Sequence, residues 1–243
     1  MKKNIIGLII ILVIIVAAGG YLIWSEMRPR NAANYYPRIK AKDFGVALDN
    51  PYFTLKPKTT YLYERETAEG IERTAIWLTD ETRVLMGVTA RGVVQRTYLD
   101  NLLKEEVKDW YAQDRSGNVW HFGRNAENIV PDQGPNRSDS WEAGVNDAQP
   151  GLVMKGNPQV GDVYRERYRE GLIEDMGEVI AVEQEVTVPL GKYLQCIKTR
   201  GWSAINQLRN EYNLYCRDLG FLAQIHATGL ETDQAGLVDM VPQ

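Results

Sequence analysis

The stretch from Glu178 to Val188, EVIAVEQEVTV, decides the fold class. Its apolar and polar residues alternate, with Ile180, Val182, Val186 and Val188 standing against Glu183, Glu185 and Thr187. Successive side chains of a strand point to opposite faces, so this period of two predicts a β-strand with one buried face. The turn-forming residues Pro189-Leu190-Gly191 follow directly, which indicates that the chain then reverses.

Similar short runs extend from this stretch in both directions, beginning at Asn50. They are rich in Val, Ile, Thr, Tyr and Trp and are broken by turn residues about every 8 to 15 positions, as in all-β folds. We therefore predict a mainly β fold, a curved antiparallel sheet closing toward a partial barrel or a two-layer sandwich. The expected strands are Thr59–Thr67, Glu72–Thr79, Arg83–Thr89, Val93–Leu99, Val107–Gln113, Asn118–Phe122, Ser140–Ala143, Asp162–Arg169, Glu178–Val188, Lys192–Thr199, Asn210–Cys216 and Gly220–His226.

Turn residues set the expected breaks between these strands. Asp80-Glu81 and Arg91-Gly92 predict turns, and the stretch from Asn125 to Asp139, rich in Pro and Gly, predicts a loop. Leu99 to Trp110 is ambiguous, because Leu102-Leu103-Lys104-Glu105-Glu106 within it favours a helix by propensity.

The first 24 residues differ from all that follows. No charged residue occurs from Asn4 to Trp24, and about 20 apolar residues are enough to cross a hydrocarbon core of roughly 30 Å. Lys2 and Lys3 precede the run, and Trp24 stands where an interfacial aromatic belt would lie. We expect a single-pass transmembrane helix in the lipid bilayer. A cleaved signal peptide, with Ala17-Ala18-Gly19-Gly20 as the cleavage region, is the alternative.

The remaining chain divides by composition into three parts. Residues 25–49 are polar and predict a juxtamembrane linker, residues 50–230 form the β-rich domain, and residues 231–243 are expected to be a C-terminal tail. Long domains translocate largely regardless of charge, so we expect this domain outside the cytoplasm, held at the cell membrane by residues 1–24.

Charge and residue inventory exclude several function classes. The formal net charge is −4, whereas a surface that follows nucleic-acid phosphates is basic, so nucleic acid is not an expected partner. Among the 243 residues, His121 and His226 are the only histidines. No nucleophile elbow, zinc motif or phosphate loop is present, so we expect no catalytic residue, no metal and no cofactor. We interpret His121, which stands between aromatic residues of a strand, as a structural histidine.

Aromatic residues supply the one candidate ligand site. Trp110, Tyr111, Trp120 and Trp141 could line an apolar or sugar-stacking cleft, and we predict that they bind a ligand. The alternative is that they form the core of a curved sheet.

Cys196 and Cys216 are the only cysteines. They fall on consecutive expected strands with the turn centred near Asn206, and in that register they face each other. Directly opposed Cα atoms of an antiparallel pair lie roughly 4.5 to 5.5 Å apart, which is within disulfide range. We therefore predict a disulfide, which forms in oxidising compartments outside the cytoplasm. Two buried free thiols are the alternative.

Several motifs resemble an uncharacterised bacterial family of exported or membrane-anchored β-rich domains. They are Asn50-Pro51-Tyr52-Phe53, Asp109-Trp110-Tyr111-Ala112-Gln113-Asp114, Gly117-Asn118-Val119-Trp120, Ser140-Trp141-Glu142-Ala143-Gly144-Val145, Val160-Gly161-Asp162 and Val188-Pro189 with Gly191 and Cys196. The resemblance implies export and an antiparallel β fold, and it implies no catalytic residue. It also interprets Asp100-Asn101 as a hairpin turn, which favours a strand from Leu102 onward. The family has Gly where Lys58 stands here.

These observations favour a membrane-tethered extracytoplasmic domain that binds and does not catalyse. The expected partner is a cell-envelope protein, or a small apolar or glycan ligand. The alternative is a carboxylate-dependent glycan hydrolase of the cell envelope, for which Glu64 and Glu66, two apart on one strand face, are a candidate pair.

We predict that the anchor is retained, because the apolar run continues past Gly20 to Trp24. The intact mass of protein extracted from membranes should include Met1 or start directly after it. A mature N-terminus near Gly19 or Tyr21 would contradict this expectation and favour the signal peptide.

Overall fold

The computed structural model describes residues 35–45, 47–130, 134–206, 210–228 and 231–243. The chain divides into two units, Met1–Tyr35 and Tyr36–Gln243, of which the second carries the described fold. The expected anchor, residues 1–24, and the start of the expected linker lie outside the described residues. Among the described residues, no helix is long and apolar enough to span a bilayer.

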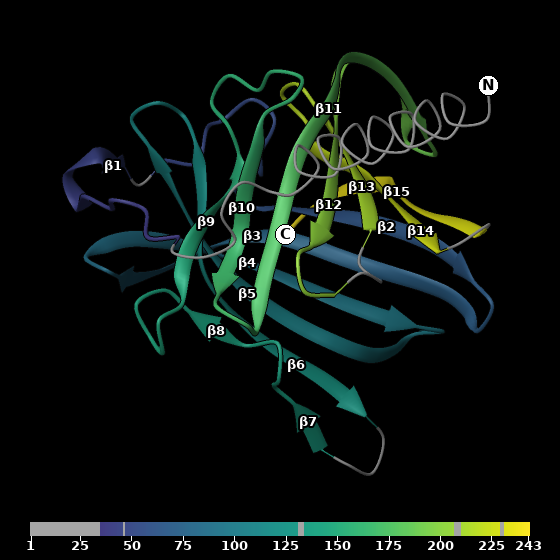
Figure 1. Cartoon of the computed structure of the whole chain (residues 1–243). Helices are drawn as coiled ribbons and strands as arrows, with labels where there is room; N and C mark the ends of the chain where they lie inside the picture. Colours follow the sequence, from purple (N-terminus) through teal and green to yellow (C-terminus); the bar gives the residue numbers. More distant parts are fainter. Residues whose placement is uncertain (1–34, 46, 131–133, 207–209, 229–230) are drawn as a thin grey trace, which may run out of the picture. The chain divides into compact units, whose positions relative to one another are not determined.

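The described unit is built almost entirely of strands, as predicted (Figure 1). The only helix among the described residues is a short 3-10 helix, η1 (Ala41–Asp43), which lies directly before β1. The strands are β1 (Phe44–Gly45), β2 (Thr59–Thr67), β3 (Gly70–Leu85), β4 (Val88–Leu99), β5 (Leu102–Asp114), β6 (Val119–Val130), β7 (Gly134–Asn136), β8 (Trp141–Glu142), β9 (Gln149–Met154), β10 (Val163–Arg169), β11 (Ile173–Val188), β12 (Gly191–Ser203), β13 (Asn210–Cys216), β14 (Gly220–Thr228) and β15 (Glu231–Pro242).

Twelve of these strands close into an antiparallel barrel. The order runs β5-β4-β3-β2-β15-β14-β13-β12-β11-β10-β9-β6, and pairing between β5 and β6 completes the ring. The strands β1, β7 and β8 are attached outside the ring, β1 to β5 and the other two to β6. Of the two predicted architectures, the barrel and the sandwich, the chain therefore adopts the barrel, and the barrel is fully closed.

Hairpin turns confirm the strand interpretation of the ambiguous stretch. Asp100 and Asn101 have φ values of 47° and 71°, and Leu99 pairs directly with Leu102. Two consecutive positive φ values are the signature of the tight hairpin turn whose twist matches the flanking strands. Lys58 also has a positive φ, 57°, which is a backbone conformation that glycine adopts more readily than other residues.

Two predicted turns are wrong, because both lie inside long strands. Asp80-Glu81 falls at a bulge of β3, where the register with β4 shifts between Leu78 and Thr82. Gly92 continues β4 and pairs with Trp110 of β5. A Cβ at Gly92 would lie 2.7 Å from Thr79 Oγ1 and 3.3 Å from the Trp110 ring, so glycine suits this crowded strand position. The reversal occurs instead after Leu85, which pairs with Val88.

Three further expectations about segments are corrected. The predicted loop from Asn125 to Asp139 contains the second half of β6 and the pairing strand β7. The predicted tail, residues 231–243, is the barrel strand β15, whose apolar residue Leu237 is fully buried. The end of the predicted linker belongs to the domain, because Phe44 pairs in β1 and packs its ring on Phe122 at 5.5 Å.

The stretch from Glu178 to Val188 is a strand, but the buried side chains switch from odd-numbered to even-numbered positions along it. Val186 and Val188 are buried as predicted, whereas Val179 is buried in place of Ile180. The register of β11 against β12 shifts near Ala181 and Gln184. Each bulge inserts a residue, which reverses the facing of the side chains that follow.

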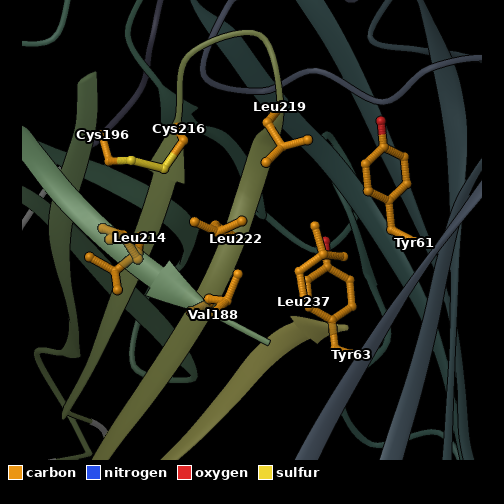
Figure 2. Packing of buried hydrophobic residues seen from close by; sticks show 11 residues of the cluster. Tyr61, Tyr63, Val188, Cys196, Leu214, Cys216, Leu219, Leu222 and Leu237 are labelled. Atoms are coloured by element: carbon orange, nitrogen blue, oxygen red, sulfur yellow. A yellow bond between two sulfur atoms is a disulfide. The ribbon is translucent and has the colours of Figure 1, made fainter. Parts of the chain in front are cut away.

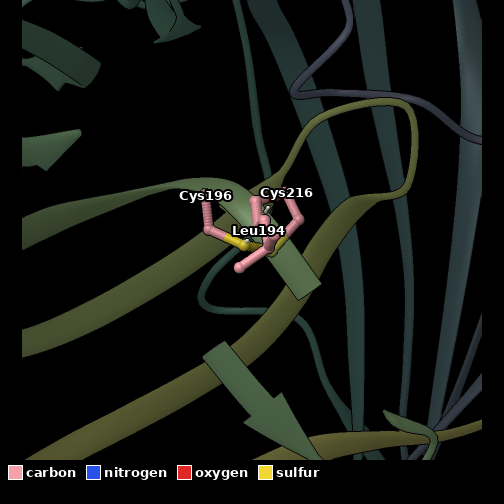
Figure 3. The surroundings of a disulfide bond; sticks show 3 residues. All are labelled: Leu194, Cys196 and Cys216. Atoms are coloured by element: carbon pink, nitrogen blue, oxygen red, sulfur yellow. Dashed lines mark hydrogen bonds between the residues drawn. A yellow bond between two sulfur atoms is a disulfide. The ribbon is translucent and has the colours of Figure 1, made fainter. Parts of the chain in front are cut away.

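The largest apolar cluster is formed by residues of β2 and β11–β15 together with Leu219 (Figure 2). Within it, Cys196 and Cys216 are bonded to each other, on directly paired positions of β12 and β13 (Figure 3). The predicted disulfide and its register are confirmed. Tyr63 and Leu237, from the neighbouring strands β2 and β15, pack in the same cluster.

Residues 48–57, here called the plug segment, lie against one end of the barrel. Asn50, only 2% exposed, holds it there: its Nδ2 donates to the carbonyl oxygens of Gly117 at 2.8 Å and Lys155 at 3.0 Å. Its backbone N–H donates to Gln113 Oε1 at 2.8 Å. One side chain thus joins the β5–β6 turn, the end of β9 and the plug segment, which gives a structural reason for the Asn50 motif.

We predict that the double substitution Cys196→Ala/Cys216→Ala lowers the free energy of unfolding by about 3 kcal/mol, because the bond closes a loop with a sequence separation of 20 residues. Urea denaturation of both proteins measures the difference, and wild-type protein reduced with dithiothreitol is the control. Alkylation of both thiols in native, unreduced protein would contradict the bond itself.

Candidate ligand site in the barrel lumen

The barrel encloses two adjoining cavities, of about 240 Å³ and 270 Å³. They share five lining residues, Tyr63, Ile76, Gln95, Phe221 and Gln224. We call the two together the lumen. The first cavity is further lined by Phe53, Thr54, Leu55, Val93, Asp109, Tyr111, His121, Arg124, Val153, Glu166, Arg167, Glu211, Asn213 and Tyr215, and the second by Arg65, Glu72, Thr74, Thr97, Glu105 and Ala235.

The lumen runs from the plug segment toward the opposite end of the barrel. Phe53 and Leu55 of the plug segment line the first cavity. The second cavity is lined by Arg65, Glu72 and Glu105, which lie close to the β2–β3 and β4–β5 hairpins at the other end. We call this hairpin end of the lumen the mouth.

A buried carboxylate joins the two strands that close the barrel. Asp109 on β5 faces His121 and Arg124 on β6: its Oδ1 lies 2.9 Å from His121 Nε2 and 3.2 Å from Arg124 Nε. The same His121 nitrogen is 2.9 Å from the carbonyl oxygen of Gly123. Both neighbours of this nitrogen are acceptors, so His121 carries its proton on Nε2.

Ion pairs extend from this seam along the barrel wall. Arg124 Nη1 lies 3.1 Å from Asp139, and Arg167 Nη1 on β10 lies 3.1 Å from the other oxygen of the same carboxylate. Arg167 also contacts Asp175 on β11 at 2.6 Å. The chain of charges thus connects β5, β6, β10 and β11 through the short segment that carries Asp139.

Burial and charge act in opposite directions on the pKa values of this network. Burial raises the pKa of Asp109, but the charge of Arg124 and the hydrogen bond from His121 outweigh it, so the pKa is lowered. Burial lowers the pKa of His121, and the Asp109 charge opposes this only in part. At neutral pH the network therefore holds an ionised carboxylate and a neutral imidazole.

The four aromatic residues predicted to bind ligand do not come together. Tyr111 lines the lumen, where its ring stacks on His121 with centroids 4.7 Å apart. Trp110, buried, and Trp120, partly buried, belong to an apolar cluster that also contains Trp141. Trp110 and Tyr111 are adjacent on one strand, so their side chains point to opposite faces and only one can face the lumen. For Trp110, Trp120 and Trp141 the core alternative describes the packing.

The other residues weighed in the sequence lie as follows. Glu64 forms an ion pair with Arg73 at 2.7 Å and is about 41% exposed, and Glu66 is exposed, so neither lines the lumen. The side chain of His226 lies outside the described part of the chain. Within that part, no three His, Cys, Asp or Glu side chains are grouped as metal ligands would be.

Sequence reasoning missed the polar residues of the lumen. Gln95 and Thr97 on β4 lie two and four positions after the buried Val93, so their side chains point to the same face of the strand. On β5, Glu105 and Asp109 likewise share a face with the buried Val107. Polar residues recurring on the apolar face of a strand are the signal of a hollow, wet interior, as in barrels that enclose a cavity.

Comparison with known proteins finds distant similarity of fold. No protein-family model matches the sequence, and no curated protein matches it. A Bacteroides fragilis protein with a YmcC-like fold, described as a candidate exported protein, is 11% identical with a TM-score of 0.46, over 78% of this chain and 98% of that one. A candidate lipoprotein of Parabacteroides distasonis is 11% identical with a TM-score of 0.42, over 79% and 99%. These values are too low to transfer any residue or role.

We predict that His121 makes the domain less stable in mild acid. Its folded pKa is lowered, so stability is fully present above the unfolded value near 6.5 and is lost as the pH falls below it. Between about pH 7 and 5, the free energy of unfolding should fall by up to about 1.4 kcal/mol per pH unit. The substitution His121→Gln, which keeps a donor for Asp109, should remove this slope.

Denaturation curves at each pH measure the effect. A His226→Gln background serves as the control, because His121 is then the only imidazole in the chain. Equal slopes with and without His121 would show that its protonation is not linked to folding.

Proposed function

We propose that this chain is a membrane-tethered extracytoplasmic domain that binds a small glycan ligand in its lumen and does not turn it over. The observation that carries the proposal is the lumen itself, whose wall combines aromatic rings with hydrogen-bonding side chains. The disulfide between Cys196 and Cys216 supports a location outside the cytoplasm, because such bonds persist in oxidising compartments. The apolar run from Asn4 to Trp24 supports the tether.

The chemistry of the wall favours a glycan over a purely apolar ligand. Tyr111, Tyr215 and Phe221 offer ring faces on which the apolar face of a sugar can stack. Gln95, Asn213 and Gln224 offer amide donors and acceptors for hydroxyl groups, and Gln224 donates to Asn213 at 2.9 Å. An apolar ligand would bury the amide donors and acceptors that these contacts leave unused, at a cost of about 1–3 kcal/mol for each unsatisfied group.

Glycan hydrolysis remains the second candidate, because carboxylates from different strands line the same lumen. Glu166 on β10 and Glu211 on β13 both face the first cavity. A glycosidase needs two carboxylic groups on either side of the bond that breaks. Asp109 does not suit the role of the acid, since its pKa is lowered and its oxygen already accepts from His121.

We predict that the full chain binds oligomers of N-acetylglucosamine or peptidoglycan fragments without cleaving them. Replacing Tyr111 with Leu should weaken binding by about 10-fold, which corresponds to losing roughly 1.4 kcal/mol of stacking. The control is Tyr98→Leu, because Tyr98 follows the lumen residue Thr97 on β4 and points to the other face. Calorimetry measures the affinities.

Three results would change the assignment. Absence of binding across the panel would refute the lumen as a glycan site, and so would equal effects of Tyr111→Leu and Tyr98→Leu. Cleavage of any oligomer, lost on changing Glu166 or Glu211 to Gln, would establish the hydrolase instead.

A further inference from the structure

Glu105 is the acidic side chain at the mouth that has no ionic partner. It lines the second cavity and is partly buried, yet it forms no side-chain hydrogen bond or ion pair with any residue that the structure describes. Its neighbours differ in this respect: Glu72, in the same cavity, is paired with Arg65 at 2.8 Å. Glu106, next along β5, is paired with Arg96 at 2.6 Å outside the lumen.

Polar groups are arranged in a row beside this carboxylate. In the register of the sheet, Glu105 on β5 is opposite Thr97 on β4, and Thr97 is opposite Thr74 on β3. The hydroxyl oxygens of Thr74 and Thr97 are 3.2 Å apart. Directly opposed side chains on one face of a sheet have Cβ atoms about 4.5–5.5 Å apart, so one small group can touch both a hydroxyl and the carboxylate.

The balance of charge in the lumen is negative. Its two cavities are lined by five acidic side chains and three arginines, and His121 is neutral at neutral pH. Arg124 and Arg167 form ion pairs with Asp109, Asp139 and Asp175, and Arg65 forms one with Glu72. None of these three arginines is within ion-pair distance of Glu105, although the charge of Arg124 still favours its ionised form.

We infer that the ligand of the lumen carries a charged amino group, as a non-acetylated amino sugar does, and that Glu105 binds it at the mouth. The inference rests on the proposed glycan site and specifies the substituent that the site selects. An ammonium group donates three hydrogen bonds, which the Glu105 carboxylate and the hydroxyl oxygens of Thr97 and Thr74 can accept. An N-acetyl group donates one and carries no charge, so it leaves the carboxylate uncompensated.

The surroundings of Glu105 agree with a cation site. Burial raises the pKa of Glu105, Arg124 on β6 lowers it, and the negative charges of Asp139, Asp109 on β5 and Glu72 on β3 raise it further. The net pKa lies above its ordinary value of 4.5. A bound ammonium group would relieve this repulsion, and protonation of Glu105 in acid would remove the attraction.

The test compares two probes of equal length on the full chain: a glucosamine oligomer with free amino groups and its N-acetylated counterpart. At about pH 6.5, where amine and carboxylate are both charged, the free amine should bind about 10-fold more tightly. The variant Glu105→Gln should abolish that preference by weakening the binding of the free amine, while the N-acetylated probe should bind at least as tightly as before. The variant Glu106→Gln is the matched control and should keep the preference.

A second measurement uses the unmodified chain and needs no variant to fold. The preference for the amine should disappear as the pH falls through the pKa of Glu105, with a midpoint above 4.5. Equal binding of the two probes, or a preference that survives in Glu105→Gln, would overturn the amino-group inference and leave the glycan site standing. Binding of neither probe would overturn the proposed glycan site and the inference together.

Discussion

The contact that the rest of the structure depends on is that of the Asp109 carboxylate with His121 and Arg124 across the β5–β6 seam. This seam is the pairing that turns a long open sheet into a ring. A charged group inside a protein is stable only when it is paired and hydrogen-bonded, and removing one partner of a buried pair costs roughly 3–5 kcal/mol. Because both partners of Asp109 come from β6, any other partner for β5 would leave the Asp109 carboxylate buried without compensation. The seam is thereby specified by charge as well as by backbone hydrogen bonds.

Closure by a polar seam has a consequence for the interior. The buried apolar residues that the structure describes form three clusters: one around the disulfide, one that contains Trp110 and Trp141, and one around Val119 and Met154. The lumen keeps polar side chains on its wall, and the plug segment, which Asn50 holds in place, lines it at one end. The same features that make the barrel hollow therefore create a site suited to a polar ligand with an apolar face.

The sequence predicted the local features of this fold and missed its long-range ones. The predicted strands Thr59–Thr67 and Asn210–Cys216 coincide with β2 and β13, because a strand can be recognised from its own residue pattern. The disulfide register was also correct, because it depends on a single hairpin. The choice between barrel and sandwich depends on whether β5 meets β6 in a ring, which no local pattern encodes. The aromatic residues predicted as one site do not line the same cavity: Trp110 and Tyr111 are neighbours on a strand, so their side chains point to opposite faces. The phase changes in β3 and β11 arose from bulges, whose positions depend on tertiary packing.

The most direct test of this account is native-state hydrogen exchange at the amides of β5 and β6. If the Asp109 seam closes the barrel, these amides should open only with global unfolding, with the same protection as the β3–β4 pair, and the change Asp109→Asn should release the β5–β6 amides first. Rapid exchange along β5 and β6 in the unmodified chain, while β3 and β4 stay protected, would mean that the sheet is open at this point and that the lumen does not exist as an enclosed site.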